Sequence, residues 1–110
     1  MAFDEHLAKR IHGLVVTCKG LSEKQMFGGL AFLLNGNMSC GIHRDELIVR
    51  IDPAATDSAL SEPGTRVFDI TSRPMKGWLL VNASAIKDET ALAEWVRRGV
   101  DYAATLPTKS

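Results

Sequence analysis

The chain has 110 residues, of which 45% are hydrophobic and 24% charged, and its 13 Lys and Arg residues balance 13 Asp and Glu residues. This length and apolar content suit one domain with its own core, so we expect a single domain over residues 1–110. The net charge of zero argues against a protein whose main task is to grip nucleic acid, because such domains usually carry a clear basic excess.

The first half of the chain predicts one helix followed by strands. Apolar residues recur at helical spacing behind Asp4, a plausible N-cap, and the helix is expected to end at Gly20 in the left-handed conformation. Asn35-Gly36 predicts a type I′ hairpin turn, because both positions of that turn need a positive φ. The strands expected in this half are residues 26–34, 37–43 and 46–51.

The second half predicts a short helix, two more strands and a long helix. Asp52 is expected to cap the short helix, with Pro53 at its first position, and the helix must end before Pro63. The later elements expected are strands at residues 66–72 and 75–82 and a helix at residues 88–104. The order α-β-β-β-α-β-β-α predicts a two-layer α+β domain with a five-stranded antiparallel sheet.

The sequence offers no assembled catalytic or metal-binding motif. Cys40 and His43 are three residues apart in an expected strand, so their side chains should point to opposite faces. Cys18 and Cys40 stand alone and are expected to be buried free thiols. We therefore expect no metal, no cofactor and no enzymatic activity.

The Gly28-Gly29 pair is expected to lie inside the first strand. No helix is expected directly after it, so the pair does not form a phosphate loop. A bulge or a close backbone approach is the first interpretation, and a flat surface on which another chain lies is the second.

The sheet is predicted to be apolar on both faces, which is unusual when helices cover only one. Either helices cover both faces, or the outer face binds a partner. We expect the second, with a homodimer as the simplest assembly and an unidentified protein as the wider possibility. The partner-interface candidates are Phe27, Leu33, Ile48, Trp78 and Leu80.

A second set of residues could bind nucleic acid. These residues are Arg50, Arg66, Arg73 and Lys76, beside Trp78. Because acidic residues are interleaved with them, a solvated face of mixed charge is the competing interpretation.

The N-terminus and the hydropathy pattern bear on location. The segment MAFDEHLAKR lacks the pattern of a signal peptide, and no stretch approaches the ~20 apolar residues of a membrane span. We expect a cytoplasmic protein without a membrane partner.

Three segments resemble one known family. KQMFGGLAFLLNGNMSCGIHRDELIVRID (24–52), SRPMKGWLLV (72–81) and ALAEWVRRG (91–99) are similar to the N-terminal domain of the TfoX/Sxy family. The resemblance implies an α+β fold of secretion-chaperone-like layout in a bacterial cytosolic protein, without catalytic residues. Longer members of the family add a helical C-terminal domain and regulate natural competence as transcriptional co-activators, whereas this chain is expected to be a stand-alone N-terminal domain.

The expected function is a non-enzymatic binding or regulatory module that acts through protein–protein contact, with a link to transcription or competence. Two alternatives stay open. The first is an accessory nucleic-acid-binding protein. The second is a small-ligand binder or enzyme with a pocket between the sheet and the helices.

Overall fold

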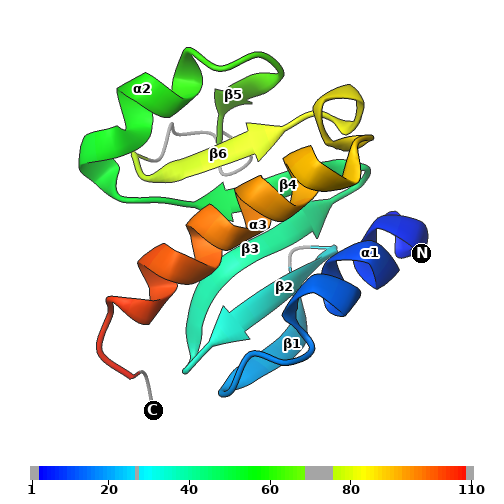
Figure 1. The fold of residues 1–110 in the computed structure, drawn as a ribbon, viewed down its shortest axis with the longest axis vertical. Coiled ribbons are helices and arrows are strands. Elements are labelled where there is room, and N and C mark those ends of the chain that lie inside the picture. The colour runs from blue at the N-terminus through cyan, green and yellow to red at the C-terminus, as the bar shows by residue number, and fades with distance from the viewer. Residues whose placement is uncertain (1–2, 27, 69–75, 109–110) are drawn as a thin grey trace.

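The protein is an α+β domain in which helices lie against one face of an antiparallel sheet (Figure 1). The computed structural model describes residues 3–26, 28–68 and 76–108. The elements in chain order are α1 (Glu5–Val15), β1 (Leu21–Met26), β2 (Gly29–Leu34), β3 (Asn37–His43), β4 (Glu46–Arg50), the 3₁₀ turn η1 (Pro53–Ala55), α2 (Thr56–Leu60), β5 (Thr65–Val67), β6 (Trp78–Val81), the 3₁₀ turn η2 (Ala83–Ile86) and α3 (Glu89–Ala104). None of the helices in these ranges has the length and apolarity to cross a membrane.

Over the residues that the structure describes, the sheet has six strands in the order β1-β2-β3-β4-β6-β5, rather than the five expected. The additional strand is β1, whose polar sequence LSEKQM lacks the alternation that marks a half-buried strand. The expected strand at 26–34 is also wrong at its start, because β1 ends at Met26 and β2 begins at Gly29. Gly28 has a φ of 71° and lies in the turn between them, so the two glycines are not inside one strand.

The last two strands are shorter than expected. β5 (Thr65–Val67) begins one residue before the expected strand at 66–72 and ends at Val67, while residues 69–72 lie outside the described residues. β6 begins at Trp78, three residues later than the expected strand at 75–82. Gly77 has a φ of 88°, so the chain turns just before this strand, and Met75 of the expected strand lies outside the described residues.

The predicted caps Asp4 and Asp52 begin their helices, but α1 ends at Val15, so its expected end at Gly20 is wrong although Gly20 has the expected positive φ of 87°. Asp4 Oδ1 accepts hydrogen bonds from the backbone N–H groups of His6 and Leu7 at 2.9 and 3.1 Å. Asp52 caps η1, and Asp88 caps α3 in the same way. Each cap satisfies donors that the first turn of a helix otherwise leaves unpaired. The caps predicted at Asp4 and Asp52 are confirmed, as is the Asn35-Gly36 turn, where φ is 52° and 83°.

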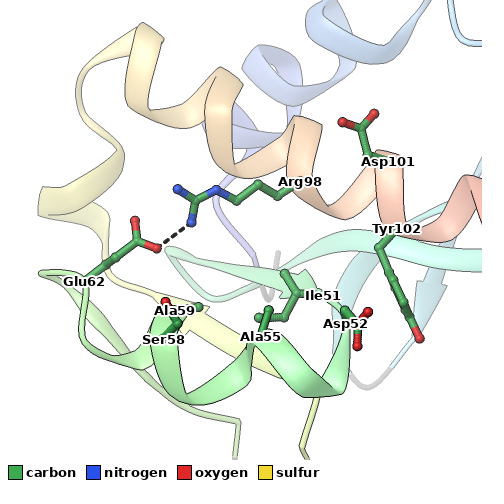
Figure 2. A pocket seen from close by; sticks show the side chains of 9 residues that line it. All are labelled: Ile51, Asp52, Ala55, Ser58, Ala59, Glu62, Arg98, Asp101 and Tyr102. Atoms are coloured by element: carbon green, nitrogen blue, oxygen red, sulfur yellow. Dashed lines mark hydrogen bonds and ion pairs between the residues drawn. The ribbon is translucent and has the colours of Figure 1, made fainter.

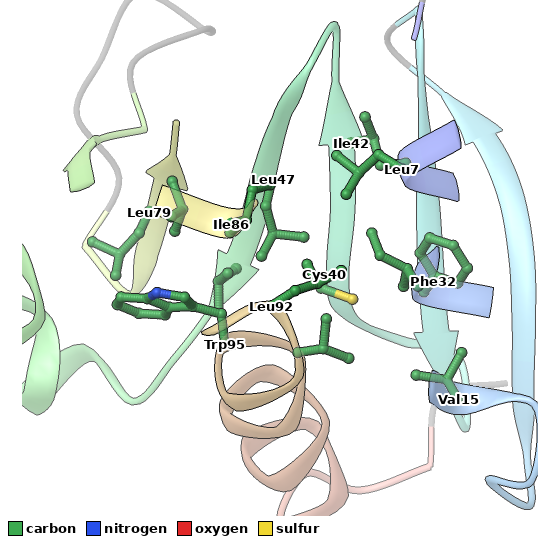
Figure 3. Packing of buried hydrophobic residues seen from close by; sticks show 14 of the residues in the cluster. Leu7, Val15, Phe32, Cys40, Ile42, Leu47, Leu79, Ile86, Leu92 and Trp95 are labelled. Atoms are coloured by element: carbon green, nitrogen blue, oxygen red, sulfur yellow. The ribbon is translucent and has the colours of Figure 1, made fainter. Parts of the chain in front are cut away.

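The core lies between the sheet and the two longer helices (Figure 3). We call the side of the sheet that faces α1 and α3 the inner face. Fully buried side chains of this core include Phe32, Ile42, Leu47 and Leu79 from the strands and Leu92 from α3. Gly99 brings α3 against β3, because a Cβ at this position would overlap the carbonyl oxygen of Ser39. The close approach explains why the middle of a long helix carries a glycine despite its cost of up to ~1 kcal/mol relative to Ala.

The opposite side of the sheet, the outer face, carries a row of small and apolar residues. Ala31, Gly41, Ile48 and Leu80 are consecutive cross-strand neighbours in β2, β3, β4 and β6. The terminal methyl of Met38 lies beside Gly41, 2.7 Å from where a Cβ would stand. Gly41 therefore leaves the space that the Met38 side chain occupies.

Candidate functional site

The end of the sheet at Arg50 gathers aromatic rings around one guanidinium group. The Arg50 guanidinium carbon lies 5.1 Å from the Trp78 ring centroid and 5.7 Å from that of Tyr102. Phe68 continues the stack, with its ring centroid 5.9 Å from that of Trp78. We call Arg50, Phe68, Trp78 and Tyr102 the Arg50 cluster.

Strand pairing and helix packing bring the Arg50 cluster together. Arg50 and Trp78 are directly opposite in the β4–β6 ladder, while Phe68 follows β5 and Tyr102 lies in the last turns of α3. A cation–π contact at an exposed site is worth ~0.5–1 kcal/mol. The two contacts of Arg50 therefore help fix the C-terminal end of α3 to the end of the sheet.

A surface hollow of about 450 Å³ adjoins this cluster between α2 and α3 (Figure 2). Its floor is apolar, with Ile51 and two alanines, and its rim is polar. The lining residues are Ile51, Asp52, Ala55, Ser58, Ala59, Glu62, Arg98, Asp101 and Tyr102. Tyr102 belongs to both features, so the hollow and the Arg50 cluster form one continuous surface region.

Arg98 crosses the hollow toward α2 and is held there by acidic side chains. Its Nη1 lies 2.6 Å from Oε2 of Glu62, and its Nε lies 3.5 Å from Oε1 of Glu94. The guanidinium also stacks over the Trp95 ring at 4.3 Å. The hydrogen bond that Arg98 donates to Glu62 is the largest cause that raises the pKa of Arg98 above its usual value. The positive charge of Arg98 is therefore already matched and does not form an open anion site.

The other charged groups of the rim also have partners. Asp52 Oδ1 accepts the Ala54 N–H at 2.9 Å as the cap of η1. Asp101 lies 3.6 Å from Arg97 on the exposed side of α3. A general acid or base needs a group that is aimed at a reacting atom and tuned in its pKa. The charged side chains at the rim of the hollow instead form ion pairs and a helix cap.

Cys40 is a buried core residue rather than a nucleophile. Burial raises the pKa of its thiol to about 12, against a smaller opposing effect of the Ser39 hydroxyl. Ser39 itself donates to the carbonyl of Phe32 at 2.9 Å. The prediction of a buried free thiol is confirmed for Cys40, whereas Cys18 is half-buried. Within the described ranges, no three His, Cys, Asp or Glu side chains are placed to hold a metal ion.

The predicted partner-interface residues do not share one exposed surface. Leu80 is fully buried and Ile48 is 8% exposed, so the expectation that these two side chains are open to solvent is wrong. Leu33 and Trp78 are half-buried. Phe27 lies outside the described residues. Alternation along a strand predicts which face a residue takes, but not how neighbouring side chains cover it.

The predicted nucleic-acid residues that the structure describes are partly engaged. Arg66 forms an ion pair with Glu46 across the outer face, and Arg50 lies between the rings of its cluster. Lys76 is exposed, and Arg73 lies outside the described residues. The nucleic-acid alternative stays a prediction.

Sequence reasoning placed Arg50 beside Trp78 in the nucleic-acid hypothesis and listed Trp78 as a partner-interface candidate. It missed Phe68, Tyr102 and Glu62 as members of the same region. The signal that joins Arg50 to Trp78 is the β4–β6 register, which depends on β6 entering the sheet between β4 and β5.

The fold and this surface region define a small two-layer α+β domain. The family model of the TfoX N-terminal domain matches residues 14–103, which is most of the chain. The chain belongs to the TfoX N-terminal domain family, and this membership associates it with regulatory, competence-related domains. No curated protein and no solved structure matches the chain significantly.

Proposed function

We propose that the protein is a non-enzymatic regulatory module that acts through protein–protein contact, linked to transcription or competence. The Arg50 cluster is the proposed contact surface, and a second copy of the chain is the simplest partner. Family membership supports the regulatory assignment.

The observation that carries this proposal is the half-buried Trp78 ring, which contacts both the tilted Phe68 ring and the Arg50 guanidinium. Trp, Tyr and Arg are the residues most enriched in interface hot spots. Their mutual stacking also restricts the side chains before a partner arrives, which lowers the entropy cost of ordering them on binding.

A non-enzymatic role is supported by how the reactive side chains are placed. The Cys40 thiol is buried with a raised pKa, so it carries little of the thiolate that attacks substrates. Arg98 and Asp52 at the hollow are engaged in an ion pair and a helix cap.

Self-association can be tested by sedimentation velocity over micromolar concentrations. We expect a concentration-dependent dimer for the wild type and loss of that dimer for Trp78→Asp, because a buried carboxylate in the contact would be uncompensated. Leu14→Asp is the matched control, since Leu14 is 38% exposed on α1, far from the cluster in the fold. A wild type that stays monomeric, or a dimer that Trp78→Asp leaves unchanged, would contradict the proposed homodimer.

A further inference from the structure

The edge strand β1 offers a second binding feature, separate from the Arg50 cluster. β1 pairs with β2 on one side, and no described strand pairs with its other side. Residues 22–25 are exposed, and β1 lies along the margin of the sheet in Figure 1. A strand with a free edge can accept an extended segment of another chain through main-chain hydrogen bonds.

The register of β1 shows which backbone groups face outward. The backbone N–H of Asn35 donates to the carbonyl of Gly20 at 3.0 Å, just before the paired residues Leu21 and Leu34. Because hydrogen-bonded and non-hydrogen-bonded pairs alternate in an antiparallel ladder, the N–H and C=O groups of Glu23 and Gln25 point away from β2. The C=O of Leu21 points the same way, whereas its N–H donates to the Cys18 carbonyl at 3.3 Å. These alternate groups form the pattern that an added strand would complete.

The two charged side chains of the edge lie on opposite faces. Glu23 is opposite the core residue Phe32, so it lies on the helix side, where its Oε2 is 2.7 Å from Nδ1 of His12. Lys24 is opposite Ala31 and lies on the outer face. An added strand would therefore meet an acidic group on one face and a basic group on the other.

A second copy of the chain fits this edge poorly. If two copies paired antiparallel through this edge about a twofold axis, residues opposite one another would lie on the same face of the joined sheet. Their residue numbers would then be both odd or both even. The two registers that use most of β1 then place either Glu23 against Glu23 of the other copy or Lys24 against its Lys24. Like charges directly opposite one another are destabilising. The edge therefore disfavours pairing with itself.

We propose that β1 is a docking edge for an antiparallel strand of a different protein, one that carries an acidic residue followed directly by a basic residue. The acidic residue would stand opposite Lys24 and the basic residue opposite Glu23, each on the matching face. This charge pattern selects one register, while the outward amides of the edge supply the main-chain hydrogen bonds. The proposal is independent of the contact at Trp78, and either can fail without the other.

A pair of peptides tests the charge pattern. The probe is the blocked peptide Val-Thr-Glu-Lys-Thr-Val, and its control is Val-Thr-Lys-Glu-Thr-Val, which has the same composition and reversed charges. NMR titration of the labelled protein should show shifts centred on Glu23 and Gln25. We expect the probe to bind about tenfold more tightly than the control, because two matched pairs replace two like-charge pairs.

Two variants of the protein sharpen the test. The double variant Glu23→Lys/Lys24→Glu should reverse the preference between the peptides. Gln25→Pro should abolish binding, because it removes an outward N–H, and it should leave the β1–β2 ladder intact, because that N–H takes no part in it. The thermal transition of Gln25→Pro reports whether the fold is preserved.

The proposal is overturned by any of three results. These results are that neither peptide shifts the β1 amides, that both peptides bind equally well, or that the charge-reversed variant keeps the wild-type preference. Binding that survives Trp78→Asp would confirm that this edge and the Arg50 cluster are separate.

Discussion

The two faces of the sheet are buried in different ways. The inner face is covered by α1 and α3 and carries large side chains such as Phe32 and Leu47. The outer face carries the row Ala31–Gly41–Ile48–Leu80, which is buried although α1 and α3 lie on the other side. Apolar residues on the outer face are thus not necessarily open to a partner, since Ile48 and Leu80 are buried within one chain.

Adjacent leucines on β6 give the most direct test of this comparison. Leu79 belongs to the inner face and Leu80 to the outer face, and both are fully buried. Leu79→Ala and Leu80→Ala should each lower the free energy of unfolding by ~2–5 kcal/mol, the usual cost of emptying a buried leucine site. Urea denaturation measures both. A cost well under 1 kcal/mol for Leu80→Ala would mean that the outer face is open in solution.

Alanine substitutions at two helical glycines, Gly99 and Gly13, distinguish the effect of packing on stability from that of helix propensity. Gly99→Ala should destabilise the protein by ~1–3 kcal/mol, because the new methyl would overlap the Ser39 carbonyl at the inner face. Gly13→Ala in α1 meets nothing within 4 Å and should stabilise by up to ~1 kcal/mol. Thermal unfolding should therefore shift in opposite directions, and equal shifts would contradict the close contact of α3 with β3.

The buried thiol of the inner face predicts a loss of stability at alkaline pH. Burial raises the folded-state pKa of Cys40 from 9.0 to about 12. Above pH 9 the unfolded chain releases this proton while the folded chain retains it, so the unfolding free energy falls as pH rises through this range. Cys40→Ala should flatten the alkaline part of the stability profile measured by urea denaturation. If the Cys40→Ala variant keeps the full alkaline slope, that slope comes from other titratable groups.

The ion pair beside the hollow should contribute little, because it belongs to neither buried face. Glu62 and Arg98 each have more than a third of their side chain exposed. Glu62→Gln is therefore expected to cost less than ~1 kcal/mol, and the cost should shrink further in high salt. A larger, salt-independent cost would show that Glu62 holds α2 against α3 through packing.

Local signals in the sequence predicted the helices and turns well. Asp4 and Asp52 cap the elements expected of them, and Asn35-Gly36 forms the expected turn. These features depend on contacts within a few residues, so the local sequence contains most of the information that determines them.

The errors arose where distant segments meet. β1 was missed because its residues Ser22 to Gln25 are polar on both faces, which is ordinary for an edge strand but carries no periodic signal. The exposure of Ile48 and Leu80 was mispredicted because alternation cannot report what lies over a face. The Arg50 cluster forms because β4 pairs with β6, and the sequence of neither strand alone indicates this pairing.

The strand order has a consequence for how the chain folds. β1 to β4 are neighbours both in sequence and in space, whereas β6 must enter between β4 and β5. Local pairings lose little loop-closure entropy, so we expect the β1–β4 meander to form early and β5 to pair last. Pulse-labelled hydrogen exchange during refolding should protect the amides of Phe32 and Ile42 before those of Leu79, which would make the Arg50 cluster one of the last parts of the molecule to assemble.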